Sequence, residues 1–99
     1  MNIDKLVYKK LTQVPEGMVT SYSELAKAVG LKNGQRVIGQ IMKKNQYPVI
    51  IPCHRVVKAD GKIGGFFYGD KVKTNMLKKE GIKIQDGKIF DFDKKFYKF

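Results

Sequence analysis

Residues 21–44 read SYSELAKAVGLKNGQRVIGQIMKK, and their pattern predicts two helices joined by a short turn. Ser21 and Glu24 have the spacing of a capping box, in which the serine caps the helix and the glutamate reaches back to it. Gly30 suits the C′ position, where the first helix would end. Apolar residues recur at helical spacing over 35–44, after a glycine-containing turn. Two short helices across such a turn are typical of a helix-turn-helix.

The second of these helices carries polar and basic residues around a glycine. Gln35, Arg36 and Lys43 are suited to an anionic partner, although a helix-turn-helix is weakly specific because many such pairs bind nothing. Gly39 costs about 1 kcal/mol of helix propensity, so it needs a reason. It would allow the backbone of a partner to approach closely, or it would serve tight helix packing within the protein. The sequence leaves both explanations open.

Two further helices are expected outside this pair. Apolar residues at helical spacing predict an amphipathic helix over 3–13. A second helix is predicted over 71–80, with Asp70 as its N-cap, Val72 among its inward-facing residues and Gly81 just past its end.

Strand signals are short and few. Extended segments are expected over 18–20 and 49–51, and a β-hairpin over 82–90 with Asp86 and Gly87 as its two-residue turn. The predicted fold is therefore mainly α with a small β element, arranged as one winged helix-turn-helix-like domain.

Composition limits the class of protein and of partner. The 99 residues, 42% of them hydrophobic, suffice for one small domain with a modest core. Twenty Lys and Arg against nine Asp and Glu give a net charge of +11, which favours a polyanionic partner. Nucleic acid ranks ahead of a membrane surface, since no long basic amphipathic helix is predicted. General lysine-rich usage is the competing explanation, because eighteen of the twenty basic residues are Lys.

Cellular location and metal content follow from what the residues lack. No apolar run reaches the roughly 18 residues of a membrane helix, and the N-terminus has no signal-peptide core. One cysteine and one histidine are too few for a soft-ligand metal site. We therefore expect a cytoplasmic protein without a metal.

The single cysteine and the single histidine are neighbours in the stretch IIPCHRVV, residues 50–57. A thiol attacks as thiolate, and His54 and Arg55 supply a base and a cation beside Cys53. Neighbours on a strand face opposite sides, so Pro52 is expected to start a turn, with a water between the thiol and the imidazole. A buried structural cysteine is the alternative, and the residues alone leave the two about equal.

Two segments rich in aromatic residues lie outside the predicted helices and strands. The loop Gly64-Gly65-Phe66-Phe67-Tyr68-Gly69 either offers aromatic faces for stacking on a base or plugs the core. The tail over 91–99 alternates Lys with Phe and Tyr, and either packs back or frays.

Several of these motifs occur together in one known family. The relevant residues are Ser21-Tyr22, Gln35-Arg36-Val37-Ile38-Gly39, Asn45, Ile51-Pro52-Cys53-His54-Arg55-Val56-Val57, Gly61-x-Ile63-Gly64 and Glu80-Gly81. Over roughly residues 3–84 the chain resembles the O6-alkylguanine-DNA alkyltransferases, the methylated-DNA-protein-cysteine methyltransferases. The resemblance implies direct repair of double-stranded DNA, in which an O6-alkylguanine is flipped out and its alkyl group is transferred irreversibly to a cysteine. It implies a single turnover, no cofactor and a nucleoid-associated monomer.

The resemblance also implies a catalytic set. Cys53 would accept the alkyl group, His54 would activate it through water, and Glu80 would orient His54. Asn45 would brace the turn that carries the cysteine. Tyr22 would push on the phosphate and donate a proton to the flipped base.

A DNA-contacting set and a pocket follow in the same way. Arg36 would fill the gap left in the base stack, while the groove face would comprise Ser21, Gln35, Gly39 and Lys43. The substrate pocket would comprise the backbone of Val56 together with Phe66, Phe67 and Tyr68. Phe66 and Phe67 stand where familiar members have Tyr-Ser, and Tyr68 stands at a Gly position. A bulkier wall and weaker acceptance of large adducts such as benzyl are expected.

The resemblance divides the chain into an active-site and DNA-binding domain over 1–90 and a Lys/aromatic tail over 91–99. The family's N-terminal domain is not represented. Two other functions compete with repair. The alkyltransferase-like proteins bind alkylated DNA without repairing it and lack the acceptor cysteine, and a general winged-helix regulator would show no preference for lesions.

Overall fold

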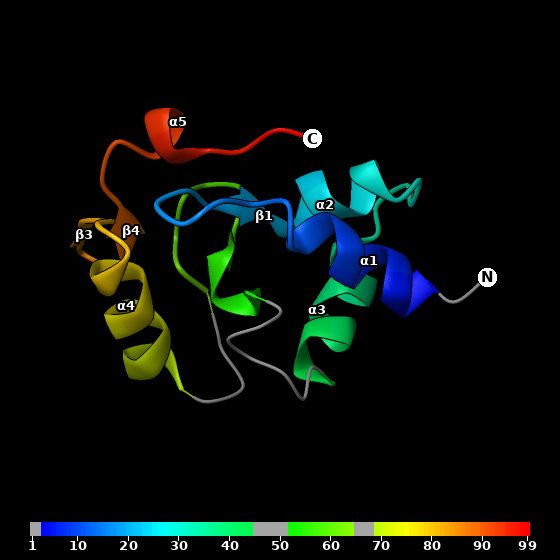
Figure 1. Ribbon diagram of the computed structural model, residues 1–99, viewed down its shortest axis with the longest axis horizontal. Coiled ribbons are helices and arrows are strands. Elements are labelled where there is room, and N and C mark those ends of the chain that lie inside the picture. The colour runs from blue at the N-terminus through cyan, green and yellow to red at the C-terminus, as the bar shows by residue number, and fades with distance from the viewer. Residues whose placement is uncertain (1–2, 45–51, 65–68) are drawn as a thin grey trace.

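The computed structural model describes residues 3–44, 52–64 and 69–99 (Figure 1). In chain order the elements are α1 (Ile3–Leu11), β1 (Thr20–Ser21), α2 (Tyr22–Ala28), α3 (Gln35–Lys43), the 3-10 turn η1 (Cys53–Arg55), β2 (Val56–Val57), α4 (Asp70–Lys79), β3 (Ile84–Gln85), β4 (Lys88–Ile89) and α5 (Phe92–Lys95). The expectation of a mainly helical domain with a small β element is confirmed. The strand expected over 49–51 lies outside the described residues.

The α2–α3 pair has the predicted helix-turn-helix form. Ser21 caps α2, because its Oγ accepts a hydrogen bond from the Glu24 backbone at 3.0 Å. The second half of the predicted capping box is wrong, since the Glu24 carboxylate accepts from the backbone N–H of Phe99 at 3.2 Å. Gly34 packs so tightly before α3 that a Cβ there would lie 2.6 Å from the Leu31 side chain. The turn therefore holds the two helices at close range.

α1 and α4 lie where helices were predicted, whereas no helix was predicted at the position of α5. α4 begins at Asp70 rather than after it, and Gly69 occupies the N-cap position. The Asp70 carboxylate still lies in the first turn, where the helix dipole favours negative charge. Gly81 has φ +87°, as its predicted C′ position requires.

Two short β ladders connect segments that are distant in sequence. β1 and β2 pair in parallel, with Thr20 opposite Val56 and Ser21 opposite Val57. This parallel register places the start of α2 beside the segment that follows β2. The predicted hairpin is confirmed as the antiparallel β3–β4 pair, whose turn residues over 86–87 both have positive φ.

Two apolar clusters hold these elements together, one on each side of the β1–β2 pair (Figure 1). The first joins α1, α2, α3 and η1 and comprises Val7, Leu11, Val14, Leu25, Ala26, Ile38, Ile41, Met42, Cys53 and Val56. The second joins the residue before β1 to β2, α4 and the hairpin and comprises Val19, Val57, Leu77, Ile82 and Ile89. The two halves therefore meet at the strands that flank η1.

The segment over 91–99 packs back onto the domain. Phe96 forms a parallel β-bridge with Val19, and Tyr97 and Phe99 pack against the first cluster. Of the two outcomes left open by the sequence, fraying is wrong.

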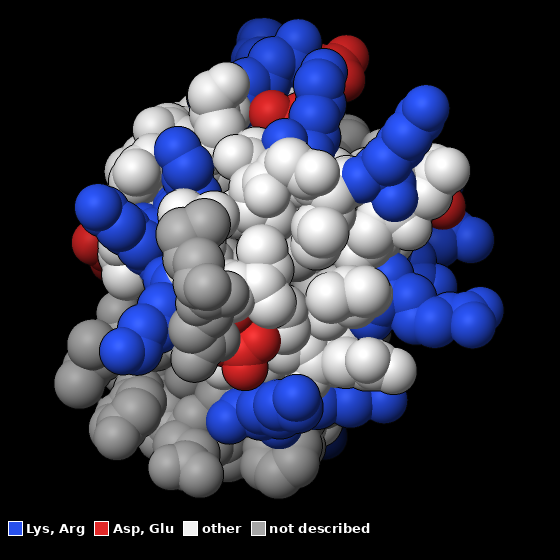
Figure 2. Space-filling model, turned by 90° about the vertical axis from the view of Figure 1, so that its right-hand side faces the viewer, with Lys and Arg blue, Asp and Glu red and all other residues white. Residues whose placement is uncertain are grey.

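Most of the lysines are exposed. Figure 2 shows Lys and Arg side chains around the margin of one face, with mainly uncharged residues and an acidic patch toward its centre. Within the described ranges, none of the helices combines the length and apolar character needed to cross a membrane.

The orientation of α3 can be tested with neighbouring residues. Ile38 is fully buried and Val37 is 41% exposed. We expect Ile38→Ala to lower the free energy of unfolding by about 2–5 kcal/mol, because it opens a cavity in the first cluster. Val37→Ala should change it by less than about 0.5 kcal/mol. Urea unfolding measures both, and equal losses would contradict this orientation.

Candidate active site

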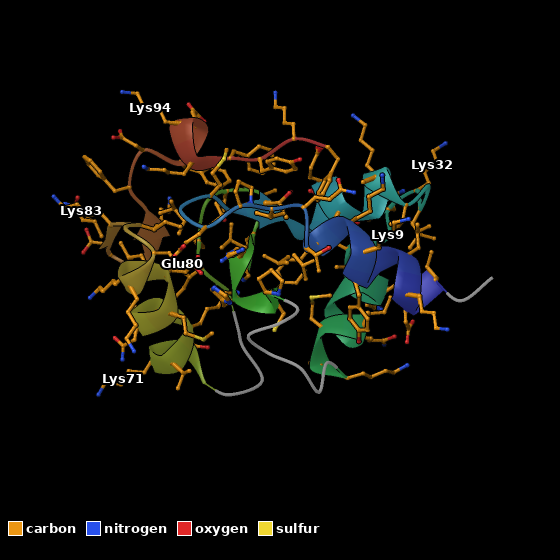
Figure 3. The ribbon with its side chains drawn as sticks, viewed as in Figure 1. Lys9, Lys32, Lys71, Glu80, Lys83 and Lys94 are labelled. Carbon is orange, nitrogen blue, oxygen red and sulfur yellow. The ribbon has the colours of Figure 1, made fainter. Side chains whose placement is uncertain are left out.

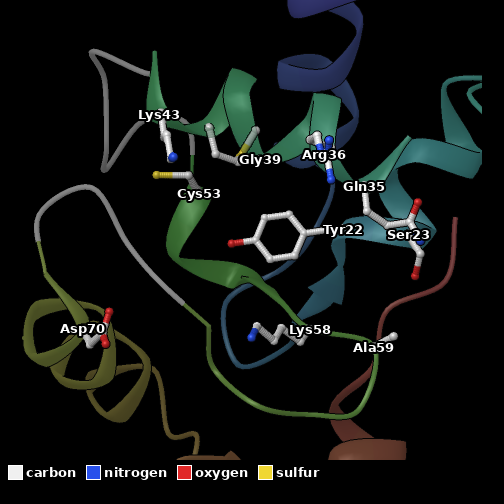
Figure 4. Close-up of a pocket in the computed structure, with 11 residues that line it drawn as sticks. Tyr22, Ser23, Gln35, Arg36, Gly39, Lys43, Cys53, Lys58, Ala59 and Asp70 are labelled. Carbon is white, nitrogen blue, oxygen red and sulfur yellow. The ribbon is translucent and has the colours of Figure 1, made fainter. Parts of the chain in front are cut away.

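A pocket of about 1000 Å³ opens between α3, the start of α2, η1 and the segment after β2 (Figure 4). From α3 its lining includes Gln35, Arg36, Gly39 and Lys43, and from the other elements Tyr22, Ser23, Cys53, Lys58, Ala59 and Asp70. Residues from five separate segments, α4 included through Asp70, thus share one concave surface. Such a surface is the default place for a ligand.

Cys53 lies at the bottom of this pocket as the first residue of η1. The turn expected at Pro52 is present, because the N–H of Arg55 donates to Pro52 O at 3.0 Å. Cys53 is 5% exposed, belongs to the first apolar cluster and also lines the pocket. The two interpretations of the cysteine that the sequence left open are therefore compatible, because the same residue is part of the core and lines the pocket.

His54 is held by Glu80. Its Nε2 lies 2.8 Å from Glu80 Oε2, and the ring is 3% exposed. Burial lowers the pKa of His54, while the hydrogen bond and charge of Glu80 act in the opposite direction. The imidazole is therefore neutral at pH 7. Because an ionised carboxylate only accepts, Nε2 carries the proton. Nδ1 is then an acceptor, and within the described ranges this buried nitrogen has no hydrogen-bond partner.

Arg55 anchors Glu80, a role that the sequence analysis did not assign. Its Nε donates to Glu80 Oε1 at 2.9 Å, and a terminal nitrogen donates to Glu80 Oε2 at 2.6 Å. The other terminal nitrogen donates to Val14 O at 2.7 Å. Burial by itself would raise the pKa of Glu80, but the hydrogen bonds from Arg55 and His54 outweigh it and hold that pKa below its ordinary value. Glu80 faces the centre of the molecule from the end of α4 (Figure 3).

Lys73 is a buried cation beside the thiol, and the sequence analysis missed it. It is fully buried on α4, and its Nζ donates to Val56 O at 2.6 Å and lies 5.8 Å from the Tyr22 ring centroid. Burial lowers the pKa of Lys73 to about 8, although Cys53 and then Asp70 oppose this shift. The ammonium form therefore predominates at pH 7.

The predicted inward residue at this part of α4 was Val72, and that prediction is wrong because Val72 is 43% exposed. Lys73, Leu77 and Glu80 share the inner face instead. Their i, i+4, i+7 spacing was the signal available in the sequence. Lys73 was not identified from this spacing because lysine is rarely found at core positions.

Tyr22 faces the same pocket from the first residue of α2. Burial, and then the nearby Cys53, raise the pKa of the Tyr22 phenol. It therefore keeps its proton at neutral pH and can donate it. Ser21, a predicted groove residue, is 3% exposed and uses its Oγ to cap α2, whereas the next serine, Ser23, lines the pocket.

The α3 residues predicted to contact a partner share one face. Gln35, Arg36, Gly39 and Lys43 all line the pocket. A Cβ added at Gly39 would meet nothing within 4 Å in the described structure. Among the described residues, tight packing therefore does not account for Gly39, and close approach of a partner stays a prediction.

The rest of the predicted set is partly outside the described residues. Asn45, Phe66, Phe67 and Tyr68 all lie there. Val56 is fully buried, its N–H donates to Cys53 O, and its own carbonyl accepts from Lys73. In the described ranges, no group of three His, Cys, Asp or Glu residues could hold a metal ion.

Comparison with known proteins adds a family to this geometry. Residues 2–82 match the family model described as 6-O-methylguanine DNA methyltransferase, DNA binding domain. A bifunctional methyltransferase/endonuclease from Picrophilus torridus is 40% identical over 93 residues, which are 94% of this chain and 30% of that protein. A methylated-DNA–protein-cysteine methyltransferase from Thermococcus kodakarensis is 46% identical over 81 residues, which are 81% of this chain and 45% of that protein. The chain thus spans less than half the length of these curated relatives.

A solved structure of similar size also matches. The crystal structure of S. pombe Atl1 in complex with damaged DNA containing O6-carboxymethylguanine has a TM-score of 0.85 and 28% identity to this chain. The match covers 100% of both chains. The residues outside the family model therefore have a structural counterpart there.

The influence of Lys73 on the thiol can be tested without any substrate. We expect Lys73→Met to slow alkylation of Cys53 by iodoacetamide at pH 7 by about tenfold, because the thiolate loses a buried cationic neighbour. The rate should recover as the pH rises and the thiol ionises without help. Intact mass against time measures the rate. Lys71→Met, at an exposed position on the same helix, is the matched control, and equal slowing in both variants would contradict the role.

Proposed function

Because the chain belongs to the 6-O-methylguanine DNA methyltransferase family, through its match to that family's DNA-binding domain, we propose that it repairs O6-alkylguanine in double-stranded DNA. The alkyl group is transferred to Cys53 in a single turnover. The observation that carries this proposal is the position of Cys53 at the bottom of a pocket whose other wall is the helix-turn-helix.

The residues around Cys53 supply the proton transfers that the reaction needs. The Sγ proton passes through a water to Nδ1 of neutral His54, and Glu80 stabilises the imidazolium that results. The thiolate then attacks the alkyl carbon, so that the C–S bond forms as the C–O6 bond breaks. The electron pair stays on the guanine, which takes a proton from the Tyr22 hydroxyl. Lys73 stabilises the negative charge at both stages from its position by Tyr22 and Val56.

The product explains why each molecule acts once. A thioether is not reduced by thiols, and Cys53 is the only cysteine in the sequence. No cofactor is required, because the attacking group and the proton donors are side chains of this chain.

The groove face gives access to the lesion. A base inside a duplex must be extruded before it can reach Cys53, at a cost of a few kcal/mol. Arg36, on the pocket side of α3, fills the vacated position in the stack. The groove of the DNA lies along the face of α3 that carries Gln35, Gly39 and Lys43. Ser21 supports the helix-turn-helix by capping α2. The family resemblance assigns the bracing of the cysteine turn to Asn45 and the pocket wall to Phe66, Phe67 and Tyr68, all of which lie outside the described residues.

A second candidate function is binding of alkylated DNA without repair. The full-length match to S. pombe Atl1 favours it. The alkyltransferase-like proteins lack an acceptor cysteine, and Cys53 with its His54–Glu80–Arg55 network argues for transfer.

Intact mass spectrometry separates these two functions. After incubation with duplex DNA carrying O6-methylguanine, repair predicts a gain of one methyl group, located at Cys53 by peptide mapping. Cys53→Ser should bind the same DNA and gain nothing. Lesion-selective binding by both proteins with no mass gain in either would support the non-repairing function.

Gly39 provides a test that separates stability from DNA contact. We expect Gly39→Ala to raise the free energy of unfolding by about 0.5–1 kcal/mol, because alanine is the better helix former and no described atom opposes its Cβ. The same variant should bind duplex DNA less tightly, since the methyl group separates α3 from the groove. Urea unfolding and fluorescence anisotropy measure the two effects. Gln40→Ala, at an exposed position outside the pocket, is the control; undiminished DNA affinity of Gly39→Ala would refute the close approach.

A further inference from the structure

Residues 91–99, called the strap below, lie outside the family match, which ends at residue 82. They comprise α5 and the extended residues that follow it. In Figure 1 the strap runs from the hairpin across β1 toward α2. None of the proposed steps uses it. It nevertheless contacts β1, which ends just before Tyr22, and α2, which begins with Tyr22.

The strap is hydrogen-bonded along β1. The N–H of Val19 donates to Lys95 O at 2.8 Å, and the N–H of Tyr97 donates to Val19 O at 2.7 Å. The hydroxyl of Thr20 donates to Tyr97 O at 3.1 Å. On its other side, Thr20 pairs with Val56 of β2. β1 is thus held between the strap and the strand that follows η1.

These bonds satisfy groups that water cannot reach. Val19 and Thr20 are both 0% exposed, and a buried backbone polar group without a partner is costly. Without the strap, β1 would have an open edge next to its short pairing with β2. Short ladders with an open edge are weakly specified in register. The strap therefore fixes where β1 ends and α2 begins.

A second set of contacts holds the first turn of α2 and the loop after β2. The N–H of Phe99 donates to Glu24 Oε2 at 3.2 Å, and Glu24 lies in the same first turn of α2 as Tyr22. The rings of Tyr97 and Phe99 pack edge to face, with centroids 5.2 Å apart, against the first cluster. At the other end of the strap, Phe92 covers Gly61, where an added Cβ would lie 3.2 Å from the ring.

We propose that the strap is a positioning segment for Tyr22: it fixes the phenol relative to Cys53 so that it can engage an extruded base. The inference rests on the proposed function, because it assigns Tyr22 a contact with the base. Cys53 itself is held by η1 and by the His54–Glu80–Arg55 network, none of which contacts the strap through a described hydrogen bond. Loss of the strap should therefore affect engagement of the lesion and leave the thiol chemistry in place.

The test compares duplex repair with simple thiol reactivity in the same variants. Tyr97→Pro removes the N–H that bonds to Val19 O, while Tyr97→Phe keeps it. We expect Tyr97→Pro to slow methyl transfer from duplex O6-methylguanine about tenfold, as misplacement of a substrate-positioning group does. Its selectivity for lesion-bearing over unmodified duplex should fall as well. Alkylation of Cys53 by iodoacetamide should stay within about twofold of the parent rate. Tyr97→Phe should match the parent in all three measurements.

A gentler pair of variants covers the case in which Tyr97→Pro does not fold. Thr20→Val removes the hydroxyl that donates to Tyr97 O, and Thr20→Ser keeps it. Thr20→Val should show the same split between duplex repair and thiol reactivity, in smaller degree. Parallel loss of both reactions, or no loss in either, would overturn the positioning role. Failure of the proposed function gives a different result, because the parent protein would then gain no methyl group from duplex DNA. The effect of the strap would still be measured by comparing the binding selectivity of parent and variants for lesion-bearing duplex.

Discussion

The carboxylate of Glu80 accepts hydrogen bonds from His54 and from Arg55, and the arrangement of the site depends on this sharing. Arg55 uses both carboxylate oxygens and also reaches Val14 O just beyond α1. The network therefore connects α4, η1 and the segment after α1 through charged groups that are largely shielded from solvent. A buried carboxylate is tolerated only when it is paired, and here the pairing also determines which nitrogen of His54 carries a proton.

The two halves of the molecule contribute different groups to the surroundings of the Glu80 network. The helix-turn-helix half presents a polar and basic face of α3 to the pocket, and the α4 half supplies Glu80, which holds His54, and the buried Lys73. Cys53 lies where the halves meet. This explains how a residue can be almost completely buried and still line an open pocket. It also explains the buried Lys73, whose ammonium group would be destabilising in an ordinary core.

Features with a local cause could be predicted from the sequence. The Ser21 cap and the turn over 86–87 each depend on residues a few positions apart, so their patterns were sufficient. The catalytic set came from the family resemblance, and the structure brings its described members together. The spacing of Lys73 could show that it shares a face of α4 with Leu77 and Glu80, but its bond to Val56 O and the role of Arg55 could not be predicted, because those partners are distant in the chain. The bond from Arg55 to Val14 O joins residues 41 positions apart, and no spacing rule indicates it.

The central claim is that His54 is a neutral base, held by Glu80 at Nε2 and directed at the thiol through Nδ1. Because His54 is the only histidine in the sequence, its ring signals in a 15N-resolved NMR spectrum need no assignment experiments. A pH titration of the whole chain should show the neutral tautomer with hydrogen on Nε2 at pH 7, and a pKa below its ordinary value of 6.5. An imidazolium at pH 7, or hydrogen on Nδ1, would contradict the account.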